Sequence, residues 1–417
     1  MKKLARRAVA AILGYQVRRL CKKNQIKVIG VVGSIGKTST KLAIASVLKA
    51  EFRVQYQTGN YNDLVSVPLV FFGGELPSLF SPMAWLAVFR RNQTVLRQLY
   101  PYDVVVLELG SDAPGQISQF KKFLKLEIGV VTAITPEHMA FFGSLDEVAK
   151  EELAIDQFSS LVLANKDLCD DKYLKPMGEH LTYGMGSGAD YKLEASNGRI
   201  SVSSGGQQLL YITDDDLSKP ELYSMLAAVS VAYKLGMQPE TIEKGLKNIK
   251  PVNGRMQKLA GINSSIIIDD SYNSSPEAVK MALDALYKSS ATQKIALLGS
   301  MNELGAYSET AHTEIGTYCD PVQLDSVVTI GKDANQYLAK AAELKGCKVH
   351  RFDSPYQAGE FIKSVIKPKA AVLVKGSQNG VFAEEAIKPL LANPDDQSKL
   401  VRQSAEWLKI KEQAFKV

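Results

Sequence analysis

The sequence is poor in the residues that would build a disulfide framework or a cysteine–histidine metal cluster. Its 417 residues include four cysteines and four histidines, all scattered, and no Cys-x-x-Cys pair occurs. No uninterrupted apolar run reaches the length of about 20 residues that a membrane-spanning helix needs. These absences argue against a disulfide-stapled fold and a zinc cluster, and they favour a cytoplasmic protein. The length allows two or three domains with ample cores.

Acidic residues are missing from the first 23 positions, which hold eight lysines and arginines. The whole chain has a formal charge of +6, so the remainder carries about −2, and nucleic-acid binding is not indicated. The spacing predicts a basic amphipathic helix over residues 1–24. Its apolar face consists of Val9, Ile12, Leu13, Val17 and Leu20. Two interpretations stay open: this helix contacts an anionic membrane surface, or it packs on a domain. Residues 77–100, around Trp85, allow the same two interpretations.

A glycine-rich turn between a predicted strand and a predicted helix is the strongest local signal. The strand at 28–32 is apolar and rich in β-branched residues, and apolar residues recur at helical spacing over 41–48. The turn between them reads Gly33-Ser34-Ile35-Gly36-Lys37-Thr38-Ser39. Glycines let backbone N–H groups approach a polyphosphate, the lysine reaches its terminal phosphates, and the threonine hydroxyl holds Mg²⁺. The turn is a variant phosphate loop, because Val31 stands where the usual pattern has its first glycine.

Two further predicted strands end in side chains that suit a nucleotide site. The strand at 103–110 contains Glu108 near its end, and the strand at 128–135 is followed by Pro136 and His138. A carboxylate at the carboxyl end of a parallel strand is where a nucleotide-bound Mg²⁺ needs a ligand. The simpler alternatives are an acid that caps the next turn and a histidine with a structural role.

The alternation of strands and helices predicts an α/β protein. Up to about residue 170 it indicates a mostly parallel sheet, followed by short antiparallel strands within 181–215. Further strands are expected at 265–270, 294–299, 326–331 and 371–376. We therefore predict a basic helix over 1–24, a central phosphate-loop domain over 25–252, and a doubly wound, Rossmann-like α/β domain over 253–417.

Seven motifs, taken together and in order, resemble the Mur ligase family, most closely its branch that adds D-alanyl-D-alanine. They lie at residues 33–39, 59–62, 108–117, 138–144, 269–276, 298–312 and 375–377. Among the most specific is Asp269-Asp270-Ser271-Tyr272-Asn273-Ser274-Ser275-Pro276. The resemblance implies an ATP- and Mg²⁺-dependent ligase of peptidoglycan precursor synthesis. Such a ligase activates a muramoyl-peptide carboxylate as an acyl phosphate, which an amine then attacks.

The resemblance also implies roles for single residues. The ATP site would comprise Gly33, Ser34, Gly36, Lys37, Thr38, Ser39, Arg255 and Asp270. Metal ions would be held by Thr38, Glu108 and His138. The substrates would lie beside Asn60, Asn62, Tyr272, Asn273 and Lys375. The catalytic set would be Lys37, Glu108, His138 and Glu152.

Two departures from the family pattern leave alternatives open. The usual N-terminal domain that grips a UDP-sugar is not found before the phosphate loop, so the acceptor is a UDP-linked, a lipid-linked, or a folate-like or polyamino-acid carboxylate. The family lysine that CO₂ carbamylates aligns with Glu152, whose carboxylate would supply the same oxygens, although a shifted alignment would place Lys150 there.

Two readings outside the ligase class also compete. A non-catalytic membrane-associated scaffold would not require the nucleotide residues. A GTPase would use Asn165-Lys166-Asp167, but that guanine-reading motif needs an aspartate where Leu168 stands. The sequence leaves the oligomeric state undetermined.

Overall fold

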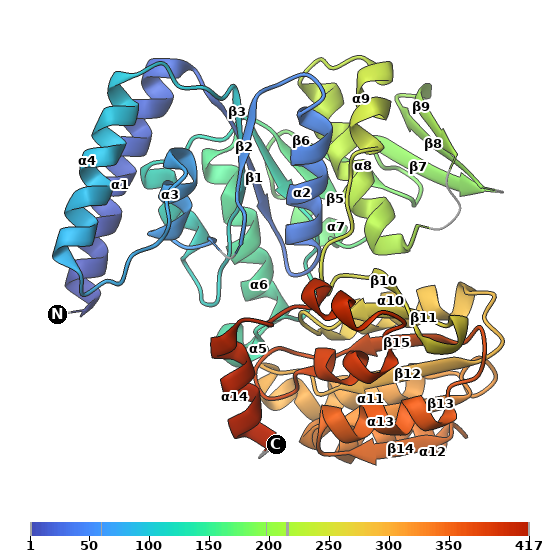
Figure 1. Cartoon of the computed structure of the whole chain (residues 1–417). Coiled ribbons are helices and arrows are strands. Elements are labelled where there is room, and N and C mark those ends of the chain that lie inside the picture. Colours follow the sequence, from blue (N-terminus) through green and yellow to red (C-terminus); the bar gives the residue numbers. More distant parts are fainter. Residues whose placement is uncertain (1, 60, 197, 214–216, 416–417) are drawn as a thin grey trace. The chain divides into compact units, whose positions relative to one another are not determined.

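The computed structural model describes the chain except for residues 1, 60, 197, 214–216 and 416–417 (Figure 1). The chain divides into two compact units. The first comprises residues 1–135, 144–217 and 221–249, and the second comprises 136–143, 218–220 and 250–417. The segment with His138 thus groups with the C-terminal unit. The predicted domain boundaries themselves stay a prediction.

The first unit is built on a mostly parallel sheet. In the described part of the chain this sheet has nine strands in the order β2-β3-β1-β4-β5-β6-β7-β8-β9, and its last two strands pair antiparallel. The strands are β1 Lys27–Val32, β2 Val54–Tyr56, β3 Val104–Glu108, β4 Ile128–Val131, β5 Val162–Asn165, β6 His180–Gly184, β7 Tyr191–Ser196, β8 Arg199–Ser204 and β9 Gln207–Thr213. Since β1 lies between β3 and β4, the carboxyl ends of these three strands meet at one edge.

Helices cover both faces of this sheet (Figure 1). They are α1 Lys2–Asn24, α2 Lys37–Leu48, α3 Ser66–Phe72, α4 Pro82–Arg97, α6 Leu145–Glu152, α7 Asp171–Leu174, α8 Lys219–Lys234 and α9 Pro239–Leu246, with 3₁₀ turns η1 Ile117–Lys122 and η2 Leu153–Phe158. Ile29 and Val31 of β1 join the core beneath α2, α8 and α9, whereas Val28 and Val32 join the core on the other face. Burial on both faces explains why β1 reads as a continuous apolar run.

The apolar face predicted for the N-terminal helix is mainly a packing face. Leu13, Val17 and Leu20 are fully buried, while Ile12 is 44% exposed. Trp85 of α4 is also buried. The interpretation that these buried side chains contact a membrane is therefore wrong. Among the described residues, no helix is both long and apolar enough to cross a bilayer.

The second unit is a separate α/β sheet with helices on both faces. Its described strands number six, in the order β10-β11-β15-β12-β13-β14, and only β10 at the edge pairs antiparallel. They are β10 Gln257–Ala260, β11 Ile266–Asp270, β12 Lys294–Gly299, β13 Ser326–Ile330, β14 Val349–Phe352 and β15 Ala371–Lys375. The helices are α5 Met139–Phe142, α10 Pro276–Lys288, α11 Ser308–Tyr318, α12 Ala339–Leu344, α13 Pro355–Val365 and α14 Ala405–Phe415. Shorter turns are η3 Ile262–Ser264, η4 Gly305–Tyr307, η5 Ala334–Leu338, η6 Ala383–Leu390 and η7 Pro394–Lys399. The predicted α/β class is confirmed.

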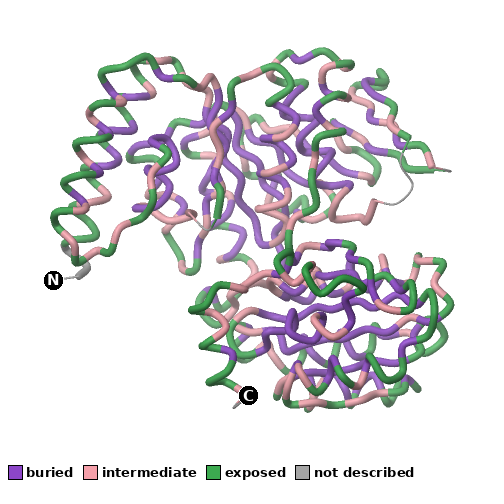
Figure 2. The backbone as a smooth tube through the Cα atoms, viewed as in Figure 1, coloured by how far each residue is buried: buried purple, intermediate pink, exposed green. Residues whose placement is uncertain are grey.

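Buried residues concentrate along the strands of each unit, as Figure 2 shows. The apolar segments predicted to be strands therefore supply much of the hydrophobic core of each unit. These rigid strands hold the polar loops at their ends.

Candidate active site

The phosphate loop joins β1 to α2 and is shaped by two glycines. Gly33 has φ +126° and Gly36, the residue before α2, has φ +81°, both in the region that favours glycine. A Cβ atom on Gly33 would lie 2.3 Å from Oγ1 of Thr132 and 2.8 Å from the backbone nitrogen of Ala133. Only glycine therefore fits this position, and the loop's N–H groups gather at the N-terminus of a 12-residue helix.

The end of β4 holds this loop in place. The hydroxyl of Thr132 donates to the carbonyl oxygens of Val32 at 3.0 Å and Ile35 at 2.6 Å. Ser34 donates through its backbone N–H to Ala133 at 2.9 Å and through its hydroxyl to the Thr135 carbonyl at 2.9 Å. Sequence reasoning missed Thr132, whose only signal was a polar residue at the end of an apolar strand.

Lys37 lies over the loop that it is predicted to serve. Its ammonium group donates to the carbonyl oxygens of Gly33 at 2.5 Å and Ser34 at 3.2 Å. These contacts keep the charge at the loop, where a bound phosphate would meet it.

Thr38 and Glu108 come together across the sheet edge. The Thr38 hydroxyl donates to Oε2 of Glu108 at 3.0 Å, and the buried ammonium of Lys41 lies 3.2 Å from the same oxygen. Gln57 fixes the backbone of Glu108 through two hydrogen bonds. Sequence reasoning missed Lys41, a charged residue inside an apolar helical stretch.

This pair suits Mg²⁺ that is bound together with a nucleotide. A hydroxyl and a carboxylate are hard oxygen ligands, and Mg²⁺ usually takes its remaining ligands from water and substrate phosphates. Within the described residues, no group of three or more histidine, cysteine, aspartate or glutamate side chains forms a complete metal site. A hydroxyl and a carboxylate leave ligand positions for water and phosphate oxygens, so this donor set fits a metal that arrives with ATP.

Glu152, at the end of α6, reaches the phosphate loop. Its Oε2 accepts a hydrogen bond of 2.7 Å from the backbone N–H of Gly33. The neighbouring Glu151 faces a different loop, accepting from the Ser111 hydroxyl at 2.9 Å and from the N–H of Ile117 at 2.6 Å. Lys150, the other candidate for the position, is 78% exposed and lies near Glu147. The structure thus brings Glu152, and not Lys150, to the loop.

The predicted acceptor segment lies beside the end of β3. Asn62 accepts from the Gly110 N–H through its backbone oxygen at 3.0 Å, and a Cβ atom on Gly110 would lie 2.4 Å from Nδ2 of Asn62. Glycine at 110 thus lets the Asn62 side chain pack directly against the backbone just after β3. Asn60 lies outside the described residues.

The second unit brings together the remaining nucleotide and amine candidates. Asp270 on β11 and Lys375 on β15 are register partners, and their side chains form an ion pair of 2.6 Å. Lys375 also donates to the Asn273 carbonyl at 3.0 Å, and the guanidinium of Arg255 lies 4.2 Å from the ring centroid of Tyr272. These five residues form one cluster at a sheet edge.

Arg402 supports this cluster and was missed from the sequence. It donates to the carbonyl oxygens of Ser271 at 2.7 Å and Tyr272 at 3.0 Å, and it pairs with the buried Glu384 at 2.6 Å. Burial also raises the pKa of Asp269, next to the cluster, to about 6.

His138 lies between two carboxylates of its own unit. It has φ +52°, and its Nδ1 lies 2.6 Å from Glu303, while its Nε2 lies 3.8 Å from Glu137. Thr38 and Glu108 belong to the first unit, so a metal shared with His138 stays a prediction. Glu303 lies within the family motif at residues 298–312, to which the sequence analysis assigned no site residue.

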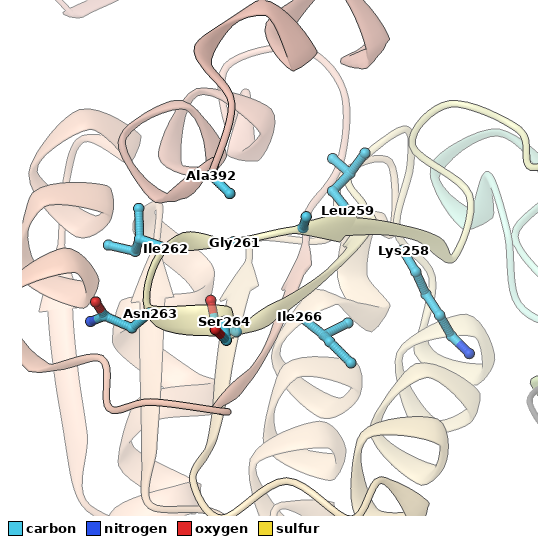
Figure 3. A pocket seen from close by; sticks show the side chains of 10 residues that line it. Lys258, Leu259, Gly261, Ile262, Asn263, Ser264, Ile266 and Ala392 are labelled. Atoms are coloured by element: carbon cyan, nitrogen blue, oxygen red, sulfur yellow. The ribbon is translucent and has the colours of Figure 1, made fainter.

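A surface hollow of about 830 Å³ lies at the β10–β11 hairpin (Figure 3). Lys258, Gly261, Asn263 and Ala392 are among its lining residues. It includes none of the predicted site residues, and an open hollow lined mainly by apolar surface has few groups to bind a polyphosphate. The candidate site is therefore defined by the loops at the strand ends.

Comparisons with family models match two regions of the chain. The Mur ligase middle domain matches residues 89–226, and the Mur ligase glutamate ligase domain matches residues 254–378. Together they match most of the two predicted α/β domains.

Named relatives agree with these matches. The UDP-N-acetylmuramoyl-tripeptide–D-alanyl-D-alanine ligase of Bacillus subtilis is 29% identical over 382 residues, which cover 88% of this chain and 76% of that protein. The ligase of the same name from Escherichia coli is 26% identical, with 88% and 77% covered. About a quarter of each relative lies outside the match.

Solved structures show the same fold. The MurF ligase of Thermotoga maritima in complex with ADP has a TM-score of 0.74 at 22% identity, and 93% of this chain and 84% of that chain are covered. MurF from Acinetobacter baumannii gives 0.72 at 22% identity, with 89% and 78% covered. A Mycobacterium tuberculosis folylpolyglutamate synthase gives 0.60 at 14% identity, with 90% and 96% covered. At these identities the likeness concerns the fold alone.

Proposed function

The chain belongs to the Mur ligase family, and from this we propose that it is an ATP-dependent ligase joining D-alanyl-D-alanine to UDP-N-acetylmuramoyl-tripeptide. The observation that carries the proposal is the phosphate loop, where Lys37, Thr38 and Glu108 meet. These are the groups that phosphoryl transfer from ATP requires, and the curated relatives carry this activity in their names.

The proposed reaction takes place in two steps, formation of an acyl phosphate and its aminolysis. The acceptor carboxylate attacks the γ-phosphorus of ATP, the bond to the β-phosphate oxygen breaks, and ADP leaves. The amine of the dipeptide then attacks the resulting acyl carbon, inorganic phosphate leaves with the bonding electrons, and the nitrogen loses a proton. Both steps require charge neutralisation and alignment of the reactants more than covalent help from the protein.

The residues of the first unit supply binding and charge. The N–H groups at the N-terminus of α2 would face the phosphates, and Lys37 would pair with their negative charge. Thr38 and Glu108 would hold Mg²⁺, which would neutralise charge on the transferred phosphoryl group. The hydrogen bond from the Gly33 N–H to Glu152 supports the proposal that Glu152 contributes a further carboxylate at this site.

The residues of the second unit would contact the nucleotide and the amine. Arg255 and Asp270 are assigned to the nucleotide, while Tyr272, Asn273 and Lys375 are assigned to the nucleotide or the dipeptide. The contacts of Lys375 with Asp270 and with Asn273 support a common role, because they hold the three residues in one arrangement.

The other acceptors have less support. The relatives' names specify a UDP-linked acceptor, and nothing in them indicates a lipid-linked one. The likeness to a folylpolyglutamate synthase concerns only the fold. A non-catalytic scaffold would not explain why Lys37, Thr38 and Glu108 meet at one loop.

The test is phosphate release from ATP and Mg²⁺ with D-alanyl-D-alanine and UDP-muramoyl-tripeptide, added singly and together, and mass analysis of the product. We expect release to require both substrates and to be abolished in Lys37→Ala. Release dependent on Lys37 but independent of these substrates would refute the acceptor assignment. No release under any mixture would refute the ligase proposal.

A further inference from the structure

Two helices of the first unit lie side by side and run in the same direction (Figure 1). The Gln16 side chain donates to the Phe89 carbonyl at 3.2 Å and accepts from the Asn92 amide at 2.8 Å. Seven residues further along α1, Lys23 donates to the Leu96 carbonyl at 3.0 Å. Because α1 and α4 are parallel, their N-terminal halves share one end of the pair.

At that end the pair exposes large apolar side chains. On α4 and the segment before it, Phe80 and Met83 are each 76% exposed, and Leu76 and Leu86 are 47% and 40% exposed. On α1, Ile12 and Tyr15 are also exposed. We call these residues the apolar tip: Ile12, Tyr15, Leu76, Phe80, Met83 and Leu86.

The tip is held by a packed layer beneath it. Trp85 is buried in a cluster with Leu13, Leu69 and Val88, and its indole N–H donates to the Ser78 carbonyl at 3.1 Å. These contacts fix the chain on both sides of Phe80. The exposure of the tip is therefore part of the folded structure, and a stable fold normally avoids such exposure unless it serves contact with another surface.

Positive charge follows the tip along both helices. On α4, Arg90 and Arg97 continue the exposed face that begins with Met83 and Leu86, at helical spacing. On α1, Arg19, whose guanidinium lies over the Tyr15 ring, and Lys22 are exposed beyond Tyr15. Neither helix contains an acidic residue.

From this arrangement we propose that α1 and α4 form a docking surface for an anionic lipid membrane. The apolar tip enters the boundary between headgroups and acyl chains, and the arginines and lysines contact the lipid phosphates. A second copy of this chain would bring positive charge against positive charge, so the charge pattern disfavours self-association. The surface differs from the packing face of α1 and from the nucleotide site.

The test is sedimentation of the full chain with vesicles of phosphatidylcholine alone or mixed with phosphatidylglycerol. We expect binding only to the anionic vesicles, weakening as salt is raised. The double variant Phe80→Ser/Met83→Ser should bind at least about tenfold more weakly, since two apolar side chains are lost from the membrane. Arg90→Gln/Arg97→Gln should bind about 25-fold more weakly, since each cation contributes about fivefold.

A matched control removes equally exposed apolar residues elsewhere. Val322 and Leu344, in the second unit, are 89% and 81% exposed. Val322→Ser/Leu344→Ser should bind vesicles as the wild type does. Thermal melting and ATP turnover should be unchanged in all three double variants, because the substituted residues are exposed and lie outside the predicted site.

Several outcomes would overturn the proposal. One is absence of binding to anionic vesicles by the wild type, and another is unchanged binding by Phe80→Ser/Met83→Ser. Sedimentation velocity without lipid tests whether a second copy of the chain binds this surface instead. A wild-type dimer that this double variant dissociates would assign the surface to a second copy of the chain and refute the membrane proposal.

Discussion

Glu151 and Glu152 are adjacent buried carboxylates on α6 for which the structure predicts opposite roles. Glu152 accepts from Gly33 at the phosphate loop, whereas Glu151 accepts from Ser111, Gly115 and Ile117. Replacing each by glutamine removes the same charge at neighbouring positions. Comparing the two glutamine variants therefore separates a contribution to catalysis from a contribution to stability.

Glu151→Gln should destabilise the protein without acting directly on the nucleotide. The glutamine oxygen can keep the two bonds to Ser111 and Ile117, but its NH₂ group then faces the Gly115 N–H. The N–H of the exposed Gly115 loses its acceptor and two charged hydrogen bonds become neutral, which together cost about 3 kcal/mol. For a unit of this size the melting temperature should fall by about 6–12 °C.

Glu152→Gln should have the opposite effects. The amide oxygen keeps an acceptor for the Gly33 N–H and only one charged hydrogen bond becomes neutral, so we expect the melting temperature to fall by only about 2–4 °C. Because a neutral amide is a poorer partner for a metal–phosphate site, Mg²⁺-dependent turnover should fall at least about tenfold. Thermal melting and turnover across a Mg²⁺ titration measure both effects.

Wild-type turnover and Mg²⁺ dependence in Glu152→Gln would refute a catalytic contribution of Glu152, which would then only stabilise the loop. Equal losses of melting temperature in both variants would contradict the division of roles. Glu152→Lys, assayed with and without added bicarbonate, tests whether a carbamylated lysine functions at this position.

Three further predictions concern stability and the loop geometry. Burial raises the pKa of Asp269 from 3.8 to about 6, so between these pH values the folded state keeps a proton that the unfolded state loses. The free energy of unfolding therefore falls by about 3 kcal/mol as the pH rises from about 4 to about 6. Asp269→Asn should remove this loss of unfolding free energy, which denaturant unfolding from pH 4 to 7 measures. A variant with the same pH dependence as the wild type would contradict the role of Asp269. Gly33→Ala should weaken ATP binding, measured by isothermal titration, because the new Cβ atom would clash with Thr132. Gly188 also has a positive φ, +81°, but a Cβ atom there would have nothing within 4 Å, so Gly188→Ala should leave ATP binding unaffected. Arg402→Gln leaves the buried Glu384 with Lys411 but without its guanidinium partner and should cost about 2–3 kcal/mol, and a melting temperature equal to the wild type would contradict this.

The sequence by itself determined the features that depend on consecutive residues. A strand, a glycine turn and a helix follow one another at residues 28–48, so the phosphate loop with Lys37 and Thr38 was predictable from local pattern. Glu108 was predictable for a related reason, because carboxyl ends of parallel strands meet at one edge of a sheet. The α/β class followed from the alternation of strands and helices.

Only the tertiary structure decided which distant side chains meet. Gly33 and Glu152 are separated by 119 positions, and Asp270 and Lys375 by 105, so no local periodicity specifies either contact. The same holds for the Arg402 bonds to the loop at Tyr272. Such pairs are set by strand order and by the packing of elements around two cores.

The N-terminal helix shows the limit of pattern reasoning most plainly. Its spacing identified an apolar face, but a face that packs and a face that contacts lipid share the same periodicity. Folding placed Leu13, Val17 and Leu20 against α3, α4 and the sheet, and it left Ile12 and Tyr15 outside. Which apolar residues remain exposed depends on the neighbours that cover the others, and those neighbours are supplied by the fold.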